Sequence, residues 1–91
     1  MPDQMKLYDI VYNDNFTFRV VIIDAIMKKY VLQRQRWDID KGRYIPDNRV
    51  KKKALTLEVD ALDLRNYKRL EDSNSPRECD LNRAIMTRRI K

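Results

Sequence analysis

Apolar and polar residues alternate with the period of a β-strand in two stretches near the N-terminus. Tyrosine and isoleucine share one face of residues 6–12, and phenylalanine, valine and isoleucine share one face of residues 16–23. Asn13, Asp14 and Asn15 lie between the two stretches and tolerate the left-handed conformations of a tight turn, so the pattern predicts a β-hairpin. A helix that begins near Thr17 is the alternative for residues 17–30. The β-branched and aromatic content favours strand.

The middle of the chain predicts a helix followed by a second hairpin. Asp24 is a typical N-cap residue, and the apolar residues among 26–31 would form the buried stripe of a helix over residues 25–35. Residues 37–45 then predict a hairpin that turns at Asp40, Lys41 and Gly42. A proline at position 46 before aspartate and asparagine indicates a loop.

The last third of the chain predicts a strand, a short helix and a longer C-terminal helix. Leucine and valine alternate with polar residues over positions 55–60, and an aspartate at 60 or 63 could start a short helix that ends near residue 72. Ser75, Pro76 and Glu78 form a capping-box pattern, which predicts a helix over residues 76–89. Either this helix docks on the rest of the protein, or it projects as an arm for a partner.

These elements predict a single α+β domain over residues 1–91, with a small antiparallel sheet and two or three helices, the last capped at Ser75. The chain has 91 residues and 43% hydrophobic content, enough for one modest core. Dimerisation would stabilise a core of this size, so a homodimer is an alternative to a monomer.

Composition excludes several kinds of chemistry. Histidine is absent and Cys79 is the single cysteine, so one chain can hold neither an internal disulfide nor a zinc site. One glycine is too few for a phosphate-cradling loop, and no cofactor is expected. The N-terminus has no signal-peptide pattern and no apolar run is long enough for a membrane span, so we expect a cytoplasmic protein with no membrane partner.

The positive charge is concentrated in residues 34–53. Eight lysines and arginines there oppose three aspartates, which gives a net +5 of the chain's +6. Cations neutralise phosphates and aromatic rings stack on bases, so this segment predicts a polyanionic partner. The predicted nucleic-acid-binding residues are Arg34, Arg36, Trp37, Arg43, Tyr44, Lys51, Lys52 and Lys53. The alternative is that Trp37 and Tyr44 belong to the core and the charges form a solvated surface.

A second basic set lies at the C-terminus, at Arg83, Arg88, Arg89 and Lys91. Cations in the last turns of a helix offset the negative end of its dipole, which is a sufficient structural reason for most of them. A second phosphate contact is the alternative.

The function expected from these features is non-enzymatic binding of DNA or RNA, mainly through the phosphate backbone. The alternative is a protein-interaction regulator or inhibitor, of the kind encoded by phages or mobile elements, whose basic patch binds an acidic protein surface. A third hypothesis, a metal-dependent nuclease, requires Asp38, Asp40 and Asp47 to converge in space.

Overall fold

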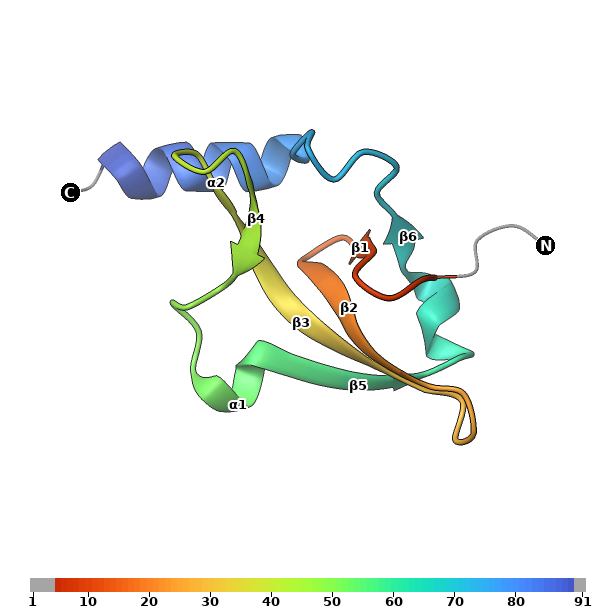
Figure 1. Cartoon of the computed structure of the whole chain (residues 1–91). Coiled ribbons are helices and arrows are strands. Elements are labelled where there is room, and N and C mark those ends of the chain that lie inside the picture. The colour runs from red at the N-terminus through yellow and green to blue at the C-terminus, as the bar shows by residue number, and fades with distance from the viewer. Residues whose placement is uncertain (1–4, 90–91) are drawn as a thin grey trace.

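The computed structural model describes residues 5–89, with the side chains of residues 5–87. It confirms the α+β class: six antiparallel strands form one sheet in the order β4-β3-β2-β1-β6, and β5 pairs with β3 (Figure 1). The strands are β1 (Ile10–Tyr12), β2 (Thr17–Asp24), β3 (Lys29–Asp38), β4 (Arg43–Pro46), β5 (Thr56–Asp60) and β6 (Lys68–Arg69). The helical elements are α1 (Lys52–Leu55), the single 3-10 turn η1 (Asp63–Asn66) and α2 (Glu78–Arg89).

Strand β3 is the centre of the sheet, and it replaces the helix predicted over residues 25–35. Its first half pairs with both β2 and β5, and its second half pairs with β4. Asp24 does accept backbone N–H groups, from Ile26 and Met27, but these bonds close a tight turn. Lys28 then takes a positive φ of 54°, which reverses the chain. Pairing along both edges of β3 outweighs the weak local preference for helix, so the helix prediction is wrong.

Both predicted hairpins are confirmed, but the first strand begins at Ile10 and not at residue 6, because Tyr8 takes a positive φ of 70°. In the first, Tyr12 lies opposite Thr17, and the Asn13 side chain accepts the N–H groups of Asn15 and Phe16 in the turn. Residues 17–24 are therefore strand, and the helical alternative that begins near Thr17 is wrong. In the second, Asp38 lies opposite Arg43, and Gly42 has a φ of +64° that suits its lack of a side chain.

The Asp38 carboxylate holds the second turn by accepting the backbone N–H groups of Lys41 and Asp40. The hydrogen bond from the Lys41 N–H, and to a smaller extent the one from the Asp40 N–H, lowers the pKa of Asp38 below its ordinary value of 3.8. A lowered folded-state pKa contributes stability above the unfolded value, and this contribution is lost as the pH falls through the folded pKa.

We therefore expect Asp38→Asn to be less stable than the wild type at neutral pH, with a smaller loss of stability below about pH 4. Urea unfolding of both proteins between pH 2.5 and 7 measures this difference. Parallel pH profiles would contradict the role given to Asp38.

The C-terminal elements follow the prediction with shifts in length. The strand predicted over residues 55–60 is confirmed as β5, whereas the short helix predicted after it contracts to η1 and is followed by β6. Helix α2 begins at Glu78, where the N–H of Leu81 bonds the Arg77 carbonyl, so Ser75 lies outside the cap position. The Ser75 N–H instead bonds Asp72 in the preceding turn.

Two hydrophobic clusters lie on opposite faces of the sheet, because consecutive strand residues point to opposite sides. The first contains Val11 and the second contains its neighbour Ile10. Helix α2 covers the second cluster by packing Leu81 and Ala84 against it, so the helix lies on the body of the protein. Within residues 5–89, no helix is long and apolar enough to cross a bilayer.

Candidate functional site: a pocket between β3 and α2

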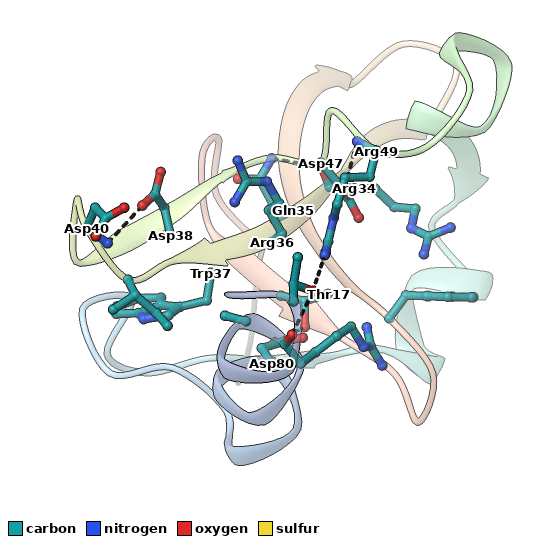
Figure 2. Close-up of a pocket in the computed structure, with 15 residues that line it drawn as sticks. Thr17, Arg34, Gln35, Arg36, Trp37, Asp38, Asp40, Asp47, Arg49 and Asp80 are labelled. Carbon is teal, nitrogen blue, oxygen red and sulfur yellow. Dashed lines mark hydrogen bonds and ion pairs between the residues drawn. The ribbon is translucent and has the colours of Figure 1, made fainter. Parts of the chain in front are cut away.

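A pocket of about 270 Å³ lies between the sheet and α2 (Figure 2). Four arginines from three separate parts of the chain line it: Arg34 and Arg36 on β3, Arg49 in the loop after β4, and Arg83 on α2. The loop stays close to β3 because the Asp47 N–H bonds the Arg34 carbonyl at 2.9 Å. The fold therefore gathers cations that are as much as 49 positions apart in the sequence.

Three of these guanidinium groups are held by neighbouring side chains. Arg34 lies over the ring of Phe16, with its Cζ 3.9 Å from the ring centroid. Arg49 donates from Nε to Asp47 Oδ1 at 3.3 Å and from Nη1 to Thr87 Oγ1 at 2.8 Å, which links the loop to α2. Arg36 donates from Nε to Asn48 at 3.2 Å. Since a guanidinium has five N–H donors, each of these groups keeps donors for a ligand.

A buried polar network under α2 fixes the wall of the pocket. Asp80 is 5% exposed, and its Oδ2 accepts hydrogen bonds from Thr17 Oγ1 at 2.5 Å and from the Tyr44 hydroxyl at 2.7 Å. Arg77 adds two bonds, from Nη1 to Thr17 Oγ1 and from its backbone N–H to the Tyr44 oxygen, both at 3.0 Å. Burial raises the pKa of the Tyr44 phenol, so this hydroxyl stays protonated and donates to Asp80. The network holds α2 against the sheet.

Acidic residues also line the pocket, but they are not spread evenly. Asp80 is engaged by hydroxyl groups and Asp47 by Arg49. Figure 2 shows Asp38 and Asp40 at the other end of the pocket from Arg34 and Arg49. Four arginines and four aspartates thus line the pocket, and the end that holds Arg34 and Arg49, away from Asp38 and Asp40, is the one suited to an anion.

The aspartates do not form the site that the nuclease hypothesis requires. Within the part of the chain that the structure describes, no three acidic, cysteine or histidine residues gather in an arrangement that could hold a metal ion. Asp47 instead pairs with Arg49, and Asp38 holds the turn of the second hairpin.

The structure divides the predicted binding residues into three groups. Arg34 and Arg36 line the pocket. Trp37 and Tyr44 are 7% and 2% exposed and pack edge to face at 5.2 Å, as the core alternative predicted, so their ring faces are covered. Exposed cations away from the pocket form the third group, with Arg43 at the start of β4, Lys51 just before α1, and Lys52 and Lys53 within α1.

Sequence reasoning missed Phe16, Arg49 and Arg83 as residues of one site. The register between β2 and β3 places Phe18 opposite Arg34. This pairing brings the start of β2, next to Phe16, to the pocket. The docking of α2 brings Arg83 there as well. Neither feature leaves a signal in composition or local spacing.

The pocket is equipped to bind an anion. Guanidinium groups form charge-assisted, geometrically specific hydrogen bonds with phosphate and carboxylate oxygens. Phe16, which is 36% exposed, adds an accessible aromatic ring beside Arg34. Comparison of the chain with protein-family models, with curated proteins and with solved structures found no match.

Proposed function

We propose that this protein binds nucleic acid without catalysing a reaction, and that the β3–α2 pocket receives the phosphate backbone. The observation that carries the proposal is the convergence of Arg34, Arg36, Arg49 and Arg83 around one hollow. Four aspartates line the same pocket, but Asp47 and Asp80 are already engaged by Arg49 and by hydroxyl groups, and Asp38 and Asp40 lie at the other end from Arg34 and Arg49 (Figure 2).

The chemistry of phosphate recognition fits this arrangement. Phosphate oxygens accept two parallel N–H bonds from one guanidinium, and neutralising a phosphate releases the counterions condensed around it. Arg34 and Arg49 are already positioned by Phe16, Asp47 and Thr87, which reduces the entropy lost on binding. The base-stacking role expected of Trp37 and Tyr44 has no part in this proposal, because both rings are buried.

Binding of a labelled 20-nucleotide oligonucleotide tests the proposal. Each phosphate neutralised on a single strand contributes about −0.7 to the slope of the logarithm of the association constant against the logarithm of salt concentration, so this slope should be about −0.7 or steeper. Fluorescence anisotropy between 20 and 300 mM salt measures the slope. No binding at 20 mM salt would overturn the proposal, as would binding that salt does not weaken.

The second candidate is a protein-interaction regulator, and a different part of the surface favours it. The turn between β2 and β3 exposes Ile26 and Met27, and Ile22 and Leu62 are also exposed. The Ala61 N–H bonds the Lys28 carbonyl, which brings the segment that carries Leu62 to this turn, and neighbouring exposed apolar side chains are typical of protein contacts. Purification without nuclease separates the candidates: nucleic acid should raise the 260/280 nm absorbance ratio, whereas a regulator should co-purify with a protein at fixed stoichiometry.

A further inference from the structure

The shape of the pocket and its accessible aromatic ring carry information about the form of the nucleic acid. We infer that the pocket takes one unstacked nucleotide of a single strand, with its phosphate on Arg49 and Arg83 and its base against the Phe16–Arg34 pair. This inference rests on the proposed function and specifies the ligand of the same site.

The pocket is concave and small (Figure 2). Its volume of about 270 Å³ is close to the lower end of the range of about 300–1,000 Å³ for small-ligand pockets, so it suits one nucleotide. Bases in a duplex are paired and stacked inside, and their faces are not available to a pocket. A single strand can turn one nucleotide out of its stack at a small free-energy cost.

Phe16 and Arg34 form a stacked pair in the lining of the pocket. The guanidinium lies 3.9 Å from the centroid of a ring that is still 36% exposed, and it forms a ready stacking platform at the pocket. Unstacked bases in single-stranded nucleic acid stack on aromatic rings and on arginine planes. With Trp37 and Tyr44 buried, Phe16 is the aromatic residue that lines the basic pocket with an accessible ring.

Charged side chains are distributed unevenly along the pocket. Asp38 and Asp40 lie at the other end from Arg34 and Arg49 (Figure 2). A backbone that ran straight across the pocket, as one strand of a duplex does, would bring further phosphates toward these carboxylates and be repelled. A flexible single strand can place one phosphate at the basic end and turn away.

The test compares a labelled 12-nucleotide single strand with the same strand annealed to its complement, by anisotropy at one salt concentration. We expect the wild-type protein to bind the single strand at least 10-fold more tightly than the duplex. Phe16→Leu keeps apolar volume but removes the ring, and should weaken single-strand binding about 10-fold while leaving duplex binding unchanged. Tyr8→Leu is the matched control, because Tyr8 is exposed and lies outside the pocket; it should bind as the wild type does.

Each outcome has a distinct meaning. Duplex binding as tight as single-strand binding would overturn the inference and leave the proposed function standing, whereas no binding of either form would overturn both. Unchanged single-strand binding by Phe16→Leu would overturn the stacking role. Competition on the wild type gives a readout that does not depend on any variant folding: thymidine monophosphate should displace the strand at a concentration at least 10-fold below that of inorganic phosphate. Equal displacement by the two would show that no base is held.

Discussion

Replacing Asp80 with alanine should lower the free energy of unfolding by about 3 kcal/mol, because it removes the shared acceptor of two buried hydroxyl groups. Thr17 and Tyr44 both donate to Asp80 Oδ2, and all three residues are buried. A hydrogen bond to a charged group contributes about 1.5–3 kcal/mol, and a buried donor left unpaired adds its own desolvation cost. Urea unfolding at pH 7 measures the change.

Two further variants make this prediction specific. Glu78→Ala removes the same charge from the same first turn of α2, but Glu78 is exposed, so the loss should stay below about 1 kcal/mol. Asp80→Asn keeps one acceptor oxygen and should give an intermediate loss. If Asp80→Ala were no more destabilising than Glu78→Ala, the network would not be what holds α2 on the sheet.

Removing the charge of three pocket arginines together should lower the affinity for single-stranded nucleic acid by about 100-fold. The variant is the triple substitution Arg34→Gln, Arg49→Gln and Arg83→Gln, and glutamine keeps some capacity for hydrogen bonds. Arg49 and Arg83 hold the phosphate of the bound nucleotide, so the loss of that contact should also flatten the salt dependence, by about 0.7 in slope. Anisotropy titrations at several salt concentrations measure both effects, and urea unfolding checks that the variant still folds.

The hairpins could be predicted from the sequence because local information specifies them. Alternation and turn residues such as Asn13 and Gly42 act over a few positions, and the structure keeps both turns. The stretch that became β3 carried an ambiguous pattern, since its apolar residues fit a helical stripe as well as a strand. Its state depends on three partner strands, and the residues of β5 that pair with it lie 23 to 31 positions further along the sequence.

The site could be predicted only in part, for a similar reason. Counting charges found Arg34 and Arg36, but composition cannot separate an exposed aromatic residue from a buried one. The cross-strand pair of Trp37 and Tyr44 faces α2 and is buried by it. Phe16, at the turn before β2, stays partly exposed beside Arg34. Burial here depends on the docking of a helix 40 positions further along the chain.

Binding should depend on the pocket and not on positive charge alone, and one matched comparison tests this most directly. The triple substitution Lys51→Gln, Lys52→Gln and Lys53→Gln removes three charges, as many as the triple substitution of the pocket arginines. These lysines are exposed, lie at α1 and do not line the pocket. Figure 1 shows α1 well separated from α2. Measured in one buffer, the pocket triple should lower the affinity about 100-fold and the lysine triple less than about 5-fold, through long-range attraction alone. An equal or larger loss in the lysine triple would contradict the account.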